Sequence, residues 1–305
     1  MSKTLAWPEL PYGAGQKTYE TIHMWTQIIG KVKLKCMPWV NHSWHVALQF
    51  TPSGLSTGLL SKGNKSFEIS LDFLKHEAYV MDSDCQRVFF SLKGLSVAGF
   101  YNKIFESLKL FNIDVVINKF PNEVINPIAF QEDHVHNTYV PGVAEALHKA
   151  ILRSFPVFSQ FRAEFVGKCS PLHFFWGSFD VAFSRFSGRL APDHPGGIPN
   201  LPDWVVQEAY SHEVFSSGFW PGSESFPHAA FYSYIYPEPS GFKDINLQTD
   251  SAFYHDGLKE FVLPYEEVRR ASDPSGLILD FLHSSYNAAA DLANWDRKAL
   301  EKKMT

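Results

Sequence analysis

Alternating apolar and polar residues, separated by turn signals, are the feature that most constrains the fold of this chain. Segments 42–50, 66–73 and 87–92 alternate in this way. Turn-forming residues lie between them, as in Pro52-Ser-Gly54 and Lys62-Gly-Asn64. Because successive side chains of a strand point to opposite faces, the pattern predicts an antiparallel meander.

Helical patterns flank this predicted meander on both sides. From Thr18 to about Ile29, apolar residues recur at helical spacing, and Gly30 is placed as a stop. Ser96 can cap a second helix that ends near Asn112. The first half of the chain therefore predicts a helix, a set of strands and a helix.

The same order of elements recurs after residue 140. Pro141 can open a helix that Pro156 kinks or breaks, and a last helix opens at Asp273-Pro274. Between these helices, strands are predicted at 172–186, 231–236 and 260–263. We therefore predict an α+β fold of two tandem helix, meander and helix repeats, 1–140 and 141–305, packed as one compact unit. A pseudo-twofold axis between the repeats is one arrangement, and chance similarity of the halves is the alternative.

The region 187–230 has no counterpart in the first half, and it is rich in glycine and proline. A connection longer than about 12–15 residues is usually functional or contains an unrecognised element. A short helix over Leu201–Tyr210 is such an element. We expect this region to form a loop that covers a site.

Composition limits the class of protein. The chain has 305 residues, of which 45% are hydrophobic and 19% charged, as in a folded soluble protein. It has neither a membrane-length apolar stretch nor the apolar segment of a signal peptide near its start, so we expect a cytoplasmic protein. The net charge of -5 and the absence of a basic stripe argue against nucleic acid or a membrane as a partner. Three widely spaced cysteines predict free thiols rather than a disulfide framework.

The strand predicted at 172–186 combines five phenylalanines with polar side chains. His173 and Arg185 share one parity, and Trp176 and Asp180 share the other. Phenylalanines on both parities indicate a strand covered on both faces, so His173 and Asp180 should be buried. A buried carboxylate is costly unless it is paired. Asp180 therefore either meets a base such as Lys168, Arg185 or Arg189, or has a raised pKa suited to acid–base chemistry.

Histidines beside carboxylates are the other candidates for chemistry. His212-Glu213 follows the loop, and His194 lies within it after Asp193. Such pairs suit acid–base catalysis or metal binding. His42 and His45 are three apart on a predicted strand and should point to opposite faces, one buried and one exposed. No zinc spacing is complete, but His42, His173, His212 and Glu213 remain candidate metal ligands.

Further candidates come from a thiol, a lysine and aromatic neighbours. Cys169 follows Lys168, which could lower the pKa of its thiol, and a buried inert thiol is the alternative. His23 lies on the first predicted helix, where it lines a cavity or faces solvent. We also expect Trp44 and Trp220 to contact a ligand. The chain has no nucleotide-binding motif.

Several long and rare strings are spread along the chain. They include Val40-Asn-His-Ser-Trp-His-Val46, Lys168-Cys-Ser-Pro-Leu-His-Phe-Phe-Trp-Gly-Ser-Phe-Asp180, Glu208-Ala-Tyr-Ser-His-Glu-Val214 and Gly218-Phe-Trp-Pro-Gly222. With these strings the chain resembles an uncharacterised, largely bacterial family, domain of unknown function 5996. Where the family has two tryptophans beside the first histidine, this chain has Ser43-Trp44. The resemblance implies a common fold and no particular reaction.

These patterns favour a small-molecule enzyme whose aromatic-lined pocket lies between the two halves. Its core would be His173, Asp180, His212 and Glu213, acting by acid–base or metal-assisted chemistry. A binding protein with an apolar cavity is the alternative. A structural protein that forms homo-oligomers through loop aromatics such as Trp220 is another.

Overall fold

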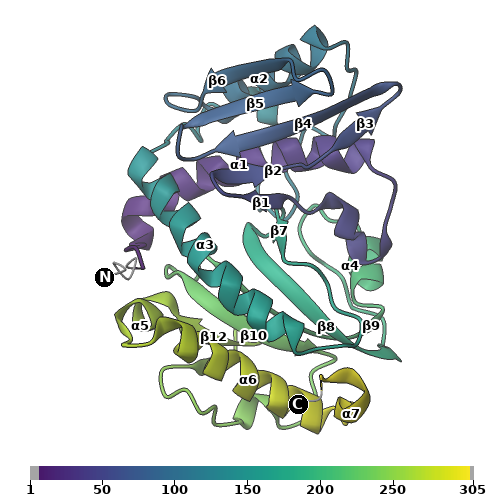
Figure 1. Ribbon diagram of the computed structural model, residues 1–305, viewed down its shortest axis with the longest axis vertical. Helices are drawn as coiled ribbons and strands as arrows, with labels where there is room; N and C mark the ends of the chain where they lie inside the picture. Colours follow the sequence, from purple (N-terminus) through teal and green to yellow (C-terminus); the bar gives the residue numbers. More distant parts are fainter. Residues whose placement is uncertain (1–6, 303–305) are drawn as a thin grey trace.

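The computed structural model describes residues 7–302, and these form an α+β fold with two antiparallel sheets (Figure 1). In the first sheet the strand order is β1-β2-β4-β5-β6, with β3 paired to β4. Its strands are β1 (Gln49–Thr51), β2 (Gly54–Ser56), β3 (Leu60–Lys62), β4 (Lys65–Asp72), β5 (Glu77–Asp82) and β6 (Arg87–Ser91).

The second sheet has the order β11-β12-β10-β9-β8-β7. Its strands are β7 (His173–Phe175), β8 (Asp180–Leu190), β9 (His212–Trp220), β10 (Ala230–Tyr236), β11 (Phe253–His255) and β12 (Glu260–Pro264). The α-helices are α1 (Tyr12–Cys36), α2 (Val97–Leu110), α3 (Pro141–Ala163), α4 (Asp203–Ala209), α5 (Tyr265–Arg270), α6 (Pro274–Leu292) and α7 (Arg297–Leu300). Short 3-10 helices are η1 (Asn41–Val46), η2 (Phe130–Glu132) and η3 (Phe242–Asp244).

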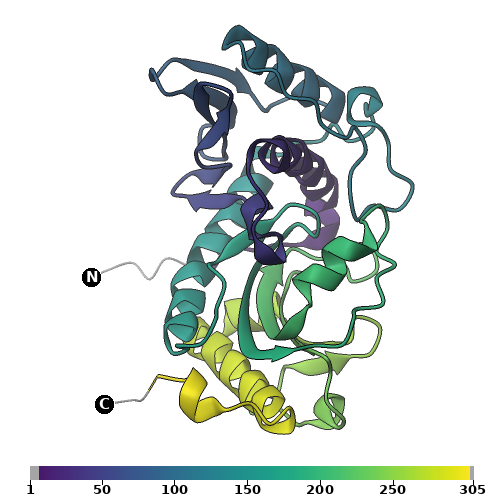
Figure 2. The same cartoon turned by 90° about the vertical axis from the view of Figure 1, so that its right-hand side faces the viewer.

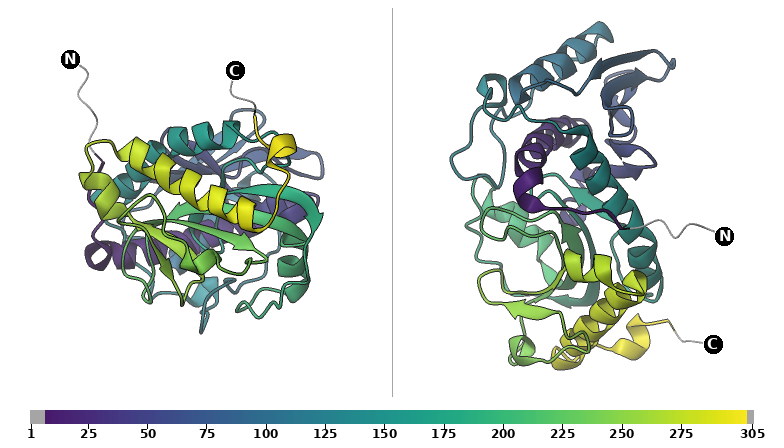
Figure 3. Two further views of the ribbon diagram at one scale, coloured as in Figure 1. Left: turned by 90° about the horizontal axis from the view of Figure 1, so that it is seen from below. Right: turned by 90° about the vertical axis from the view of Figure 1, so that its left-hand side faces the viewer.

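Helix α1 lies between the first sheet and the second half, and Figure 2 shows it nearly end-on. Helix α6 crosses the second sheet, and α3 runs from the level of α1 down to α6 (Figure 3). Leu48 and Phe174 exchange backbone hydrogen bonds of 2.9 and 3.2 Å between the halves. One hydrophobic core runs through both halves, so they pack as one compact unit. A common origin of the repeats, with a boundary near residue 140, stays a prediction.

Many local predictions are confirmed. Strands β4 and β6 match the predicted alternating segments, and α3 begins at Pro141 and continues through Pro156. The Ser96 hydroxyl accepts a hydrogen bond from the Gly99 backbone at 3.1 Å, as a helix N-cap does. Within residues 7–302, no helix combines the length and apolar character needed to cross a bilayer.

The prediction that the first helix stops at Gly30 is wrong, because α1 continues to Cys36. A Cβ atom at position 30 would lie 2.3 Å from the Trp176 indole. Glycine is therefore needed here for close packing inside a helix rather than for ending it.

The strand predicted at 42–50 is wrong for residues 42–46, which belong to η1, and a strand begins only at Gln49. His42 and Ser43 have φ angles of 56° and 55°, in the left-handed region that a strand does not visit. The parity argument for the two histidines therefore fails, and both His42 and His45 are buried.

The predicted strand 172–186 is a hairpin, in which β7 and β8 are joined by a turn at 176–179. The predicted loop 187–230 is also wrong in part. It contains α4, where a short helix was expected, but also the end of β8 and all of β9, which lies between β8 and β10. Strand β9 escaped detection because its serines and Gly218 interrupt the apolar pattern.

The two faces of the second sheet differ in chemistry. Phe183, Phe215 and Phe231 point toward α3 and α6, where Phe183 packs 5.3 Å from Phe158. On the other face, the register places Ser184 beside Ser216 and Ser216 beside Tyr234. This hydroxyl-rich face is buried under the segment that contains α4, and it forms the floor of the candidate site.

Candidate active site

Two adjoining pockets lie between the two halves of the chain. The outer pocket, about 500 Å³, is bounded by α1, η1, residues 118–123, the hairpin turn and residues 198–210. The inner pocket, about 160 Å³, reaches Asp180 and the hydroxyl-rich face of the second sheet. His42, Phe175, Ser178, Ala209 and Tyr210 line both pockets. The two spaces therefore form an aromatic vestibule and a polar inner end.

The hairpin turn is held in place by the first half. The Trp176 indole packs against Gly30, and its Nε1 donates to the Val46 carbonyl oxygen at 2.9 Å. His23 Nε2 donates to the Gly177 carbonyl oxygen at 2.8 Å, and its ring stacks on Phe179. Burial lowers the pKa of His23 to about 4, so the ring is neutral. His23 and Trp176 thus position the turn, and Trp176 also lines the outer pocket.

Glu123 reaches over this turn from the first half. A Cβ atom at Gly177 would lie 1.9 Å from Glu123 Oε1, so glycine allows the carboxyl group to approach the backbone. The backbone N–H of Glu123 donates to the Pro199 carbonyl oxygen at 2.8 Å. Burial, aided by the charge of Asp180, raises the pKa of Glu123 to about 7. Its carboxyl group can therefore both release and accept a proton near neutral pH.

Asp180 lies at the inner end of the site and is only 8% exposed. Its carboxyl group accepts hydrogen bonds from the Ser178 hydroxyl, at 2.5 Å, and from the Tyr232 hydroxyl. Among residues 7–302 no base forms an ion pair with it, so the predicted salt bridge is wrong. Burial raises the pKa of Asp180, as the alternative prediction required.

Tyrosines extend the polar floor beyond Asp180. Tyr232 and Tyr234 are two apart on β10 and share a face, and the Tyr210 and Tyr234 hydroxyls lie 2.6 Å apart. Glu260 begins the neighbouring strand β12, and burial together with the charge of Asp180 raises its pKa to about 8. The floor is thus a layer of phenols and of carboxyl groups whose pKa values are raised by burial.

His42 borders both pockets and meets Lys168 at its outer nitrogen. His42 Nδ1 lies 3.0 Å from the Ala209 carbonyl oxygen, which can only accept, so Nδ1 carries the proton. Lys168 Nζ lies 2.6 Å from Nε2 and donates to it. Burial, and then the charge of Lys168, lower the pKa of His42. Burial lowers the pKa of Lys168 against the opposing charge of Glu208.

The backbone of His42 is strained, and contacts from the second half hold it. Its N–H donates to Glu208 Oε1 at 2.9 Å. Left-handed conformations of non-glycine residues gather at functional sites, where the surrounding structure enforces them. The ring also stacks on Phe186 at 4.6 Å and lies 5.3 Å from Trp44, which lines the inner pocket.

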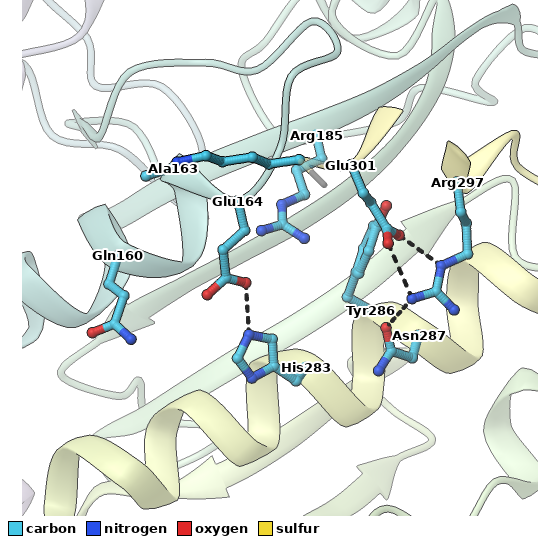
Figure 4. Close-up of a pocket in the computed structure, with 10 residues that line it drawn as sticks. Gln160, Ala163, Glu164, Arg185, His283, Tyr286, Asn287, Arg297 and Glu301 are labelled. Atoms are coloured by element: carbon cyan, nitrogen blue, oxygen red, sulfur yellow. Dashed lines mark hydrogen bonds and ion pairs between the residues drawn. The ribbon is translucent and has the colours of Figure 1, made fainter. Parts of the chain in front are cut away.

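Three predicted site residues are not part of this site. Glu213 lies on the other face of the sheet and pairs with Arg189 at 2.7 Å, because His212 and Glu213 are adjacent on a strand. Arg185 lies on the same face of the sheet as Glu213, where its guanidinium packs 3.5 Å from the centroid of the Phe161 ring. Figure 4 shows Arg185 beside Glu164 and Tyr286. The pKa of Cys169 is raised by burial, which outweighs nearby Arg162 and Arg185, so the thiolate expected beside Lys168 is not favoured.

The three remaining histidines lie at the edge of the site, and Trp220 is a fourth predicted residue outside it. The His173 ring lies 5.9 Å from Trp44, and burial lowers its pKa to about 4. His212 approaches His42 with ring centroids 6.0 Å apart, and His194 packs 4.8 Å from Tyr210. Trp220 packs on Phe226 and Tyr232 away from both pockets. The predicted core of four residues is thus divided, with Asp180 alone in the inner pocket.

A metal centre is not formed by the predicted ligands. Within the part of the chain that the structure describes, no group of three or more histidine, cysteine, aspartate or glutamate side chains is placed to hold a metal ion. Glu213 in particular is separated by the sheet from His42 and His173.

Several site residues were missed from the sequence. Tyr232 and Tyr234 alternate in the string Phe231-Tyr-Ser-Tyr-Ile-Tyr236, and this signal was sufficient to place two phenols on one face. Glu123 has no comparable signal, since it lies in an irregular segment. Its one indirect signal is Gly177, because a glycine within a strand pattern often marks the close approach of another group, here the Glu123 carboxyl group.

Comparison with known proteins gives a family but no function. No curated protein and no solved structure matches the chain. The model of a family of unknown function, DUF5996, matches residues 7–302. The match covers almost the whole chain, which therefore belongs to this family.

Proposed function

We propose that this protein is a cytoplasmic enzyme that binds a small molecule in the outer pocket and exchanges protons with it through Asp180 and Glu123. One observation carries the proposal. Two carboxyl groups with raised pKa values flank the Gly177-Ser178 turn where the outer and inner pockets meet. Ionisable groups perturbed in this way and facing a pocket are typical of acid–base sites. The three free cysteines fit a reducing compartment.

The roles follow from the two environments. Asp180 is held by Ser178 and Tyr232, and burial raises the pKa of its carboxyl group, so it is suited to hold and donate a proton. Glu123, with a pKa of about 7, is suited to remove one. The tryptophans Trp39, Trp176 and Trp204 around the outer pocket would hold an apolar or aromatic part of the substrate.

The test compares turnover by the unmodified protein and by Asp180→Asn. A screen of small metabolites by thermal shift and tryptophan fluorescence first identifies ligands, and mass spectrometry then detects their turnover. Because asparagine resembles a protonated aspartate in shape but has no proton to transfer, turnover should fall about 100-fold or more while binding persists. Tyr232→Phe should cause a smaller loss.

The matched control is Glu213→Gln, a carboxyl group on the opposite face of the same sheet. It should retain full turnover. Full turnover by Asp180→Asn would contradict the proposal. Ligands that bind at the outer pocket without any chemical change would favour the second candidate, a binding protein, which the apolar lining of that pocket supports.

A further inference from the structure

A further pocket lies on the other side of the second sheet, remote from the two pockets of the candidate active site. Its volume is about 480 Å³, and it is enclosed by α3, α6 and the chain around α7. Figure 4 shows that the Arg185 guanidinium faces the hollow between Glu164 and Glu301, with Tyr286 beside it. None of these residues lines either pocket of the candidate active site.

Arg185 is a buried cation without an anionic partner. It is 2% exposed, and its guanidinium packs 3.5 Å from the Phe161 ring and 4.4 Å from the Tyr286 ring. One terminal nitrogen donates to the Phe161 carbonyl oxygen, but among the described residues Nε has no hydrogen-bond partner. Within residues 7–302 no carboxylate forms an ion pair with it. Buried charges are normally paired, so this donor edge is open to an anion.

Tyr286 supplies a second open donor at the same place. Within residues 7–302 its buried hydroxyl has no partner in hydrogen-bonding geometry, although burial and the nearby Glu301 carboxylate raise its pKa, and its ring packs against Arg185. Buried tyrosine hydroxyls usually find a partner. A single acceptor group in the pocket would satisfy the Arg185 Nε edge and the Tyr286 hydroxyl together.

The carboxylates of the pocket are already engaged elsewhere. Glu301 pairs with Arg297 at 2.6 Å, and Glu164 pairs with His283 at 2.7 Å (Figure 4). Asn287 accepts a hydrogen bond from Arg297 at 2.6 Å. The two carboxylates also bring negative charge near the pocket, which disfavours ligands with several negative charges.

We propose that this pocket binds the carboxylate group of a small organic monoanion, held by the Arg185 guanidinium and the Tyr286 hydroxyl. Arginine recognises carboxylates through parallel N–H donors, and the aromatic walls exclude water from that contact. Glu164 and Glu301 border the rest of the ligand and favour one that also carries a hydrogen-bond donor or an ammonium group. The proposal is independent of the function proposed for the other face of the sheet.

The test uses the full chain and two probes, sodium acetate and sodium glutamate, each compared with sodium chloride at equal ionic strength. A specific site stabilises the folded state with a saturable dependence on probe concentration. We expect a saturating rise of a few degrees in the thermal midpoint, Tm, for at least one probe and none for chloride. Tyr286→Phe keeps the ring but loses the donor, and should weaken the apparent affinity about tenfold.

Tyr265→Phe is the matched control, because Tyr265 is equally buried but donates to Pro8 outside this pocket. Its probe affinity should equal that of the original protein. Chemical shifts of the unmodified protein give a test that does not depend on a variant folding. Shifts on titration should centre on His283, Tyr286 and Asn287. Absence of saturation with both probes, an unchanged affinity in Tyr286→Phe, or shifts centred elsewhere would each overturn the proposal.

Discussion

Raising the pH from 6.5 to 8.0 is expected to lower the Tm of this protein by about 3 °C, which corresponds to roughly 2 kcal/mol of unfolding free energy. Burial raises the pKa of Glu123 from 4.5 to about 7 and that of Glu260 from 4.5 to about 8. Each group binds its proton more tightly in the folded chain than in the unfolded chain. Their stabilisation is complete below pH 4.5 and is lost as the pH rises through the folded pKa.

Other buried groups set the limits of the pH range in which these two carboxyl groups control stability. The pKa values of His23 and His173 are lowered to about 4, so both destabilise the fold as the pH falls below 6.5 and have little effect above it. Burial lowers the pKa values of Lys31 and Lys33 to about 8, so their opposite contribution begins near the upper end of the window and offsets only part of the carboxyl effect. Between pH 6.5 and 8.0 the carboxyl groups therefore dominate the slope.

Calorimetry or circular dichroism across this range measures the effect. Glu260→Gln should remove most of the slope, because glutamine keeps the shape of the protonated side chain and cannot ionise. Glu213→Gln, on the opposite face of the sheet, should retain it. A slope in Glu260→Gln equal to that of the unmodified protein would show that Glu260 does not hold its proton in this range.

Gly30→Ala is the second change with a large expected effect, a loss of about 3 kcal/mol in unfolding free energy. The new methyl group would lie 2.3 Å from Trp176, whose ring is buried and fixed by the bond from Nε1 to Val46. The ring must move out of the interface between the halves, and this cost exceeds the gain of about 1 kcal/mol that alanine brings to a helix. Denaturant unfolding gives the free energy, and a red shift of tryptophan emission reports the displaced ring.

Gly13→Ala is the control within the same helix, because a Cβ atom at Gly13 meets no atom within 4 Å. It should be neutral or stabilise the protein by less than about 1 kcal/mol. If Gly30→Ala were as stable as Gly13→Ala, the close packing of Trp176 on α1 would be refuted.

The elements that the sequence predicts well depend on local interactions. Alternation and flanking turns place β4 and β6, and the Ser96 and Asp273 side chains cap α2 and α6 at the predicted residues. In each case the controlling contacts lie within a few residues along the chain. The residues of one segment then make most of the interactions that stabilise its helix or strand.

The failures occur where distant residues override a local pattern. His42 alternates with its neighbours as a strand would, but Glu208 and Ala209 hold it in a left-handed turn. The string Trp176-Gly-Ser-Phe179 turns the chain inside an aromatic run, because α1 supplies a packing surface at Gly30 and a hydrogen bond from His23.

For the candidate site, the types of residue that take part could be predicted from the sequence, but which of them lie close together could not. Asp180 was recognised because a carboxyl group among phenylalanines requires an explanation, and its burial and raised pKa agree with one of the two predicted outcomes. Glu213 seemed equally suitable, but the pleat of β9 turns it to the opposite face. Glu123 comes from the other half of the chain, and no spacing in the sequence connects it with Gly177.

By itself the sequence determined the family, the α+β class, most helices and the aromatic segment that contains Asp180, because these depend on residue type and local periodicity. The tertiary structure alone decided that Glu123 and Asp180 flank one turn and that Arg185 faces a separate pocket. The reason is physical. The pKa of a carboxyl group and the partners of a cation both depend on burial and on groups that are far apart along the chain. Both are therefore set only when the two halves pack together.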